Sequence, residues 1–196
     1  MEKKVSLCVA AALCALSASA TVWYVAPDGT GGGTSSTDRG DAQIVVNTKM
    51  KAGDTVYFAP GTYNLDAQKG VNPNTGYGVY FILGSTGDIA NLIVVGESEN
   101  PEDVRLVGTP SDRMRIIYCA TGGHQIRNLL MTGGYTDYQG AGICMADSFV
   151  PKHEQSFFAS NCVLGPALLP PPPPDLPEGM SPFGMIVSPG GKWERF

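Results

Sequence analysis

The sequence predicts an all-β solenoid, a fold in which short strands recur along the chain and stack on one another. The 196 residues include 25 glycines and only 16% charged residues, a balance typical of turn-rich β proteins. From residue 52 onward, short apolar runs alternate with Gly, Pro, Asn and Asp. Several runs recur after 23 or 24 residues, as from Val56 to Tyr80 and from Ile93 to Ile116. The turn spacing alone also fits a sandwich, but this longer repeat favours a parallel β-helix.

Residues 1–20 have the pattern of a secretory signal peptide. Charged residues at positions 2–4 precede an apolar stretch at 5–16, and Ala18 and Ala20 supply the small residues that a signal peptidase requires. An apolar run of about 12 residues is short for a membrane anchor. We therefore expect cleavage after Ala20, a mature chain that is not an integral membrane protein, and a location outside the cell or in its envelope.

The mature chain begins with a predicted strand at residues 21–26 and a glycine-rich turn. Residues 41–51 predict a short amphipathic helix, because Ala42, Val45, Val46 and Met50 share one face. Its N-cap is expected among residues 35–38. Such a helix would cover an apolar surface.

The remaining strands are expected at residues 55–59, 79–83, 92–95, 104–107, 115–119, 126–131, 142–145 and 161–164. In the first of these, Val56 and Phe58 would face one side and Thr55 and Tyr57 the other. Gly53 and Gly61 suit tight turns at its ends, and Pro60 would end the strand ladder because it has no N–H to donate.

Three cysteines remain after signal removal: Cys119, Cys144 and Cys162. An exported chain permits disulfides, but each of these residues has apolar neighbours and none has zinc-site spacing. We expect buried free thiols. A single disulfide bond is the alternative.

Three stretches, at residues 23–29, 52–63 and 126–134, resemble the opening coils of right-handed parallel β-helix proteins of the pectin-lyase-like superfamily. The most specific is the run Gly-Asp-Thr-Val that begins at Gly53, followed by Pro-Gly-Thr-Tyr from Pro60. Residues 140–143 and 160–163 are similar to repeats of exported polymorphic outer-membrane proteins. The resemblance implies a right-handed β-helix domain at residues 21–165, with the helix at 41–51 as its cap.

Residues 166–196 hold nine of the 15 prolines, five of them consecutive at 170–174. Proline cannot continue a β ladder, so the β-helix should end near Gly165. This segment is expected to be either a disordered proline-rich tail or an out-of-frame end that truncates the β-helix.

The resemblance also implies where chemistry would lie. Relatives that cleave pectate pair calcium-binding acidic residues with an Arg or Lys base, which makes calcium a possible cofactor by analogy alone. The residues available for such roles match no family motif: Asp137, Asp147, Arg113, Arg115 and Arg127. We expect no catalytic site, no metal site and no cofactor.

The other polar residues have simple structural interpretations. The alternation of Arg113 and Arg115 predicts surface charge, and the acidic residues at 97–103 predict a solvated turn. His124 is expected in a turn, and neither it nor His153 has a catalytic partner.

Tyr135, Asp137 and Tyr138 are the candidate substrate-binding residues, because aromatic rings beside glycines suit a sugar platform. Stacking between coils is the alternative role for these rings.

The predicted function is that of an exported β-helix protein for cell-surface interaction or glycan contact. The alternative is a truncated polysaccharide lyase or glycoside hydrolase that acts on a uronate-containing polysaccharide. A net charge of −5 and a pI near 4.9 argue against a nucleic-acid partner.

Overall fold

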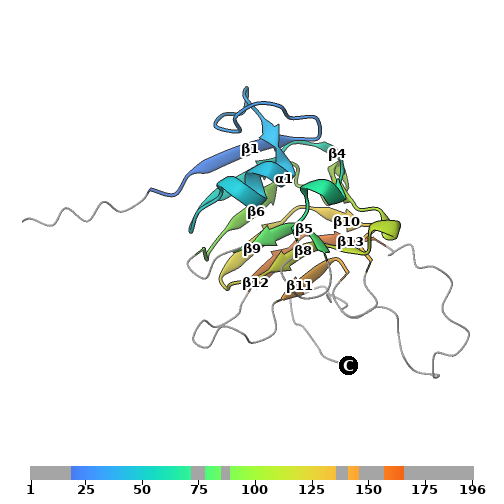
Figure 1. The fold of residues 1–196 in the computed structure, drawn as a ribbon. Coiled ribbons are helices and arrows are strands. Elements are labelled where there is room, and N and C mark those ends of the chain that lie inside the picture. Colours follow the sequence, from blue (N-terminus) through green and yellow to red (C-terminus); the bar gives the residue numbers. More distant parts are fainter. Residues whose placement is uncertain (1–18, 72–77, 85–88, 136–140, 146–156, 166–196) are drawn as a thin grey trace, which may run out of the picture.

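The protein is mostly β, with its strands in three parallel sheets (Figure 1). This computed structural model describes residues 19–71, 78–84, 89–135, 141–145 and 157–165. The first 18 residues and the proline-rich segment after Gly165 therefore lie outside the described residues. No helix in the described part of the chain is long and apolar enough to cross a membrane.

Each sheet contains strands from widely separated parts of the chain. In spatial order, the six-stranded sheet consists of β12 (Phe157–Ser160), β9 (His124–Arg127), β6 (Ile93–Gly96), β3 (Thr55–Phe58), β1 (Val22–Ala26) and β2 (Gly40–Asp41). The four-stranded sheet consists of β13 (Val163–Leu164), β10 (Leu130–Thr132), β7 (Val104–Val107) and β4 (Gly61–Asn64). The three-stranded sheet consists of β11 (Ile143–Met145), β8 (Met114–Cys119) and β5 (Gly78–Leu83).

From β3 onward the chain visits the three sheets in a fixed order. The rounds are β3–β4–β5, β6–β7–β8 and β9–β10–β11, and β12 and β13 begin a fourth. Each round therefore adds one parallel strand to each sheet, and a buried residue in one round lies beside a buried residue of the next.

The predicted 23-residue repeat is not the spacing of these rounds. Val56 pairs with Val94 of the same sheet, 38 positions later, and Val94 pairs with Ile126, 32 positions later. The interval from Val56 to Tyr80 instead runs from the six-stranded to the three-stranded sheet within one round. The prediction was wrong because it matched apolar runs across different sheets.

The predicted amphipathic helix is present as α1 (Ala42–Ile44), which continues into a π-helical turn at Val45–Lys49. Its N-cap is Asp41, whose Oδ1 accepts a hydrogen bond from the Ile44 N–H at 3.0 Å. The expected cap at residues 35–38 was wrong, since Ser35 and Asp38 close a separate turn. Short 3₁₀ turns occur at Ala67–Lys69, Pro101–Asp103 and Pro110–Asp112.

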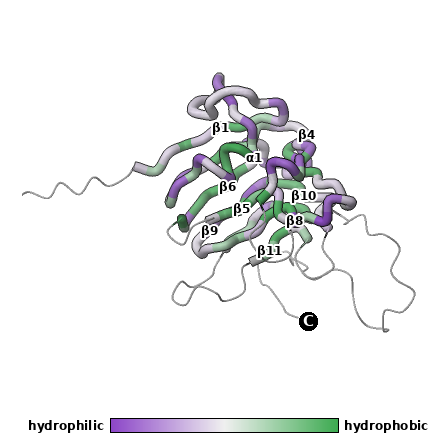
Figure 2. Tube along the Cα trace, viewed as in Figure 1, coloured by the Kyte–Doolittle hydropathy of each residue, from purple (hydrophilic) through white to green (hydrophobic). Residues whose placement is uncertain are grey.

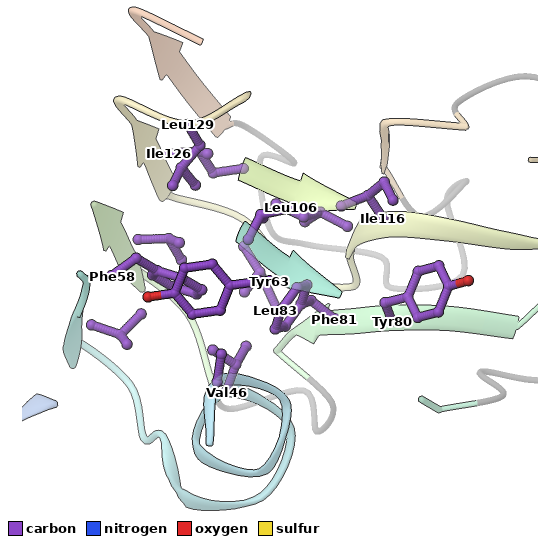
Figure 3. Packing of buried hydrophobic residues seen from close by; sticks show 14 of the residues in the cluster. Val46, Phe58, Tyr63, Tyr80, Phe81, Leu83, Leu106, Ile116, Ile126 and Leu129 are labelled. Atoms are coloured by element: carbon purple, nitrogen blue, oxygen red, sulfur yellow. The ribbon is translucent and has the colours of Figure 1, made fainter. Parts of the chain in front are cut away.

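The helix packs on one continuous hydrophobic core (Figure 3). Apolar residues follow the strands and the helix, whereas polar residues mark the turns (Figure 2). The four helix-face residues predicted to be buried are all in this core: Ala42, Val45, Val46 and Met50. They share it with the largest buried strand residues, among them Phe58, Phe81, Leu83, Leu106, Ile116 and Ile126.

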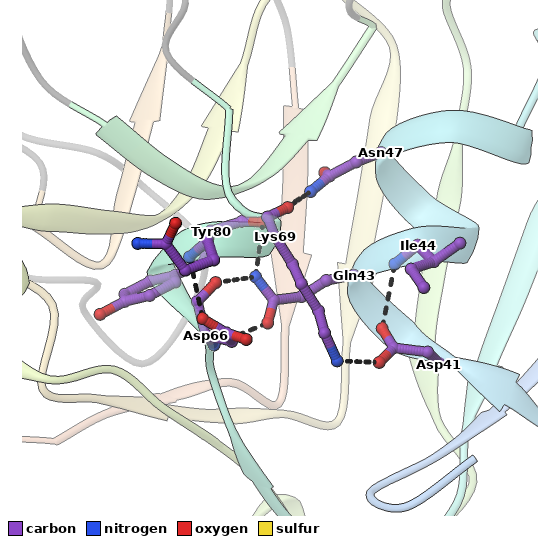
Figure 4. Close-up of polar contacts among 8 residues, drawn as sticks. Asp41, Gln43, Ile44, Asn47, Asp66, Lys69 and Tyr80 are labelled. Atoms are coloured by element: carbon purple, nitrogen blue, oxygen red, sulfur yellow. Dashed lines mark hydrogen bonds and ion pairs between the residues drawn. The ribbon is translucent and has the colours of Figure 1, made fainter. Parts of the chain in front are cut away.

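β5 is the edge strand of the three-stranded sheet, and amide side chains from the helix form hydrogen bonds with its backbone (Figure 4). Asn47 Nδ2 donates to the Tyr80 carbonyl at 2.8 Å, and Asn47 Oδ1 accepts from the Ile82 N–H at 3.0 Å. One turn earlier, Gln43 bonds both the N–H and the carbonyl of Asp66, at 2.8 and 3.0 Å. Asn47 thus bonds β5 as a neighbouring strand would, so this edge is closed to strand addition.

Most predicted strand boundaries differ from the observed ones by one residue, and the strand predicted at 161–164 is shortened to β13. Two further predictions differ more. The expected strand at 126–131 is two strands, β9 and β10, because Asn128 adopts a left-handed conformation (φ 57°) and redirects the chain. Gly61, expected in a turn, begins β4, whereas Gly53 is in a turn with φ of 80°, as predicted.

Cys119, Cys144 and Cys162, the cysteines in the described part of the chain, are free thiols. Cys119 is buried, and burial raises the pKa of its thiol to about 12. Cys144 and Cys162 are partly buried. The predicted free thiols are confirmed, with full burial only for Cys119.

Candidate functional site

The outer face of the six-stranded sheet is the candidate functional site. Side chains alternate across each strand, so that Val56 and Phe58 of β3 are buried while Tyr57 is partly exposed, as predicted. Because the strands pair in register, outward residues of successive strands form straight rows. One row contains Tyr24, Tyr57, Val95, Arg127 and Ser160, and the next contains Val22, Thr55, Ile93, Gln125 and Phe158.

Two tyrosines form the centre of the site. The rings of Tyr24 and Tyr57 are stacked, with centroids 5.8 Å apart and planes inclined by 23°. Both side chains are partly exposed. They come from neighbouring strands that are 33 positions apart in sequence, so the sheet register is what brings them together.

An ion pair borders the tyrosines. Arg39 Nη1 and Nη2 lie 2.9 and 3.1 Å from the two carboxylate oxygens of Glu97. The same guanidinium carbon lies 5.9 Å from the Tyr24 ring centroid. Since both partners are about a quarter exposed, this pair contributes at most about 1 kcal/mol to stability. Its main effect is to fix a cation and an anion beside the aromatic rings.

Arg127 supplies a further cation in the same row, exposed on β9 and hydrogen-bonded to Gln125 Oε1. We call this set, Tyr24, Tyr57, Arg39, Glu97 and Arg127, the tyrosine surface. Aromatic faces pack on the C–H face of a sugar ring, while guanidinium and carboxylate groups bond hydroxyls or carboxylates. The arrangement therefore suits binding of a polar ring compound.

The predicted sugar platform is only partly described. Tyr135 is partly exposed and follows β10, and its N–H donates to the Met114 carbonyl of β8 at 2.9 Å. The Arg113 guanidinium carbon lies 5.9 Å from its ring centroid. Asp137 and Tyr138 lie outside the described residues. Tyr135 is thus bonded to the three-stranded sheet and is not part of the tyrosine surface.

The arginines considered for catalysis are dispersed. Arg113 is exposed, but Arg115 is only 6% exposed, so its prediction as surface charge was wrong. The reason is that all six residues of β8 are buried, since both faces of this strand are covered. Arg127 lies on a different sheet, and Asp147 is outside the described residues.

The acidic segment at residues 97–103 forms a hydrogen-bonded turn, as predicted. Asp103 accepts hydrogen bonds from Ser98 Oγ at 2.6 Å and from Asn100 Nδ2 at 3.1 Å. Asn100 Oδ1 in turn caps the Glu102 N–H at 3.2 Å. Within the described ranges, no three or more His, Cys, Asp and Glu side chains are grouped to hold a metal ion.

His124 is a core residue of β9, which corrects its predicted place in a turn. It is 1% exposed, and its Nδ1 accepts the Leu92 N–H at 3.3 Å. Nε2 therefore carries the proton and donates to Thr121 Oγ1 at 3.0 Å. Burial lowers the pKa of His124 from 6.5 to about 4, so the ring is neutral at pH 7. His153 lies outside the described residues.

Comparison with known proteins adds no further constraint: no family model, no curated protein and no solved structure matches the chain. The parallel sheets are compatible with the resemblance to β-helix proteins. The tyrosine surface must therefore be assessed on its own geometry.

Sequence reasoning did not identify the tyrosine surface. It placed Tyr57 on the outward face of its strand, but it gave no register that would set Tyr24 beside it. The available signal was that Tyr24 and Tyr57 occupy equivalent places in two alternating runs, Val22–Ala26 and Thr55–Phe58.

Proposed function

We propose that this chain is an exported right-handed parallel β-helix protein that contacts a polysaccharide or another cell-surface glycan through its tyrosine surface. The observation that carries the proposal is the stacked Tyr24–Tyr57 pair with Arg39 and Glu97 fixed beside it. A solenoid presents rows of side chains at regular spacing, which suits an extended polymer.

Two further observations support the proposal. The repeated visit to three parallel sheets is the order expected of a β-helix. The small residues at Ala18 and Ala20, after an apolar run, support export.

Binding to soluble polysaccharides tests the proposed surface. The chain from Thr21 to Phe196 would be titrated calorimetrically with a uronate-containing polysaccharide and, separately, with a neutral one. We expect the double substitution Tyr24→Thr with Tyr57→Thr to weaken binding at least tenfold, because threonine suits a strand but has no ring. Tyr135→Ser is the matched control and should leave affinity unchanged.

Loss of binding in Tyr135→Ser alone would place the glycan site at the loop after β10 and contradict the proposed surface. The expectation from sequence that the chain has no catalytic site is tested with pectate and calcium. Release of unsaturated uronate products by the purified protein would contradict it and favour the lyase alternative.

A further inference from the structure

A buried carboxylate lies at the point where the predicted leader joins the first strand. Asp54 precedes β3 and is 1% exposed. Its Oδ1 accepts the Thr21 N–H at 2.7 Å, and its Oδ2 accepts the Trp23 Nε1–H at 2.9 Å and the Lys51 N–H at 2.8 Å. Asp54 thus ties together the start of β1, the segment that follows the helical turn and the start of β3.

This buried charge has no cationic side chain paired with it in the described part of the chain. The two ion pairs found there are Arg39 with Glu97 and Lys69 with Asp41, and neither involves Asp54. Buried carboxylates are costly unless a cation or several N–H donors compensate them. Asp54 has three N–H donors, one of which is the backbone nitrogen of Thr21.

That nitrogen is the atom that signal removal would change. Hydrolysis of the Ala20–Thr21 peptide bond adds the hydroxyl of water to the Ala20 carbonyl carbon and its proton to the Thr21 nitrogen, which then ionises as an ammonium group. Ser19, Ala20 and Thr21 are exposed, and the Thr21 carbonyl already accepts the Thr55 N–H at 2.9 Å. The new ammonium group would therefore form 2.7 Å from Asp54 Oδ1 without rearrangement of β1.

We propose that Asp54 is the receptor for the amino terminus created by leader removal, so that processing stabilises the folded protein through an ammonium–carboxylate pair between Thr21 and Asp54. This inference rests on the export that is part of the proposed function. Before cleavage, Thr21 contributes a neutral N–H to the Asp54 carboxylate. After cleavage it contributes an ammonium group, which adds a charge–charge attraction to the hydrogen bond already present. The precursor is accordingly the less stable form, and the mature chain the more stable one.

Three forms of the same chain test the proposal. The first begins at Thr21 with a free amino group, the second begins at Thr21 with that group acetylated, and the third begins at Ser19. Each would be unfolded in urea at pH 7. We expect the unfolding equilibrium constant of the free-amine form to be about tenfold lower than that of the other two, because only that form has an ammonium group on the Thr21 nitrogen, beside Asp54.

Asp54→Asn removes the carboxylate and should abolish this difference, whereas the matched control Asp28→Asn, at an exposed position beyond β1, should preserve it. If Asp54→Asn does not fold, the acetylated form alone decides the question. Equal stability of the free and acetylated forms, or a difference that persists in Asp54→Asn, would overturn the proposal.

Mass measurement of the chain recovered from secreting cells separates this inference from the proposed function. A chain that begins at Thr21 supports both. A chain that retains residues 1–20 would overturn export and the inference together. A processed chain whose free-amine form shows no added stability would overturn the inference and leave the proposed function intact.

Discussion

Neutral His124 links β9 to the residue that precedes β6. Its Nδ1 accepts the Leu92 N–H, and its Nε2–H donates to Thr121 Oγ1, which donates to the Ile89 carbonyl. Protonation of Nδ1 would remove the acceptor for Leu92 and place a charge in the core. The stability of this junction therefore depends on His124 remaining neutral.

The folded-state pKa of His124 is lowered to about 4 from 6.5, so the unfolded chain takes up the proton first as pH falls. The stabilising contribution is complete above pH 6.5 and is lost between pH 6.5 and 4. We expect at most about 3 kcal/mol of the free energy of unfolding to be lost across this window. His124→Asn, which keeps an acceptor near the Nδ1 position, should flatten that part of the curve. The free energy of unfolding would be measured in urea at several pH values from 7 to 4. If it falls as steeply with pH in His124→Asn as in the parent chain, this account is contradicted.

Two glycines with positive φ differ in what a side chain would meet. Gly133 has φ of 72°, and a Cβ built there lies 2.0 Å from the Gly108 carbonyl oxygen. Gly53 has φ of 80°, but a Cβ there meets only the Ala20 Cβ at 3.8 Å. We expect Gly53→Ala to cost about 1–2 kcal/mol, from the left-handed conformation alone. Gly133→Ala should cost more than about 4 kcal/mol, because the backbone must also move. Equal midpoints in urea would refute this distinction.

The helix protects the β5 edge by side-chain hydrogen bonds. Asn47→Ala leaves the Ile82 N–H without its acceptor and removes the closer of two amide donors to the Tyr80 carbonyl. We expect a loss of about 2–3 kcal/mol in the free energy of unfolding. Thr48→Ala, which removes only an exposed hydrogen bond to the Ile44 carbonyl, is the control and should cost about 0.5 kcal/mol or less. A similar loss in both variants would contradict the role assigned to the Asn47 hydrogen bonds, because alanine raises helix propensity at both positions and only Asn47 bonds β5.

Most strands with several apolar residues could be predicted from sequence, with β12 as the exception, whereas weakly patterned strands could not. The prediction for residues 104–107 matched β7, and those for residues 55–59 and 79–83 differed from β3 and β5 by one residue. β4 was missed because it begins at Gly61 and has one buried apolar side chain, Tyr63. The buried face of the helix was predicted correctly, since it depends on local spacing. Its amide bonds to β5 were not, since they depend on which strand lies beside it.

At the scale of the whole molecule, register was the property that sequence could not supply. Paired residues such as Val56, Val94 and Ile126 are separated by intervals of unequal length, because the connections between strands differ from round to round. Inward and outward faces follow from alternation within one strand. The tyrosine surface requires the pairing of Tyr24 with Tyr57, which only the folded sheet defines.

The two ends of the stack differ in their protection. Gln43 and Asn47 both donate to the Tyr80 carbonyl at the edge of β5, whereas no described strand pairs with the outer edges of β12, β13 or β11. Phe158 is 55% exposed on β12, and Val163 and Leu164 of β13 are more than a third exposed. Open strand edges with apolar side chains favour association.

We expect Phe158→Lys to lower self-association, measured by sedimentation across a range of concentrations, without lowering the thermal midpoint. The charge would oppose contact between copies, and the exposed ring contributes little to the core. Ile44→Lys is the control, since Ile44 is equally apolar and 44% exposed on the helix at the protected end. A parent chain that remains monomeric at every concentration, or an equal effect of both variants, would contradict the prediction.

The most direct test of the tyrosine surface is an NMR titration of the tyrosine ring signals with a uronate-containing polysaccharide. The account predicts that the signals of Tyr24 and Tyr57 shift and saturate together, while those of Tyr63 and Tyr80, which are buried in the core, stay in place. Shifts confined to Tyr135, or no shift of Tyr24 and Tyr57 at saturating polysaccharide, would contradict it.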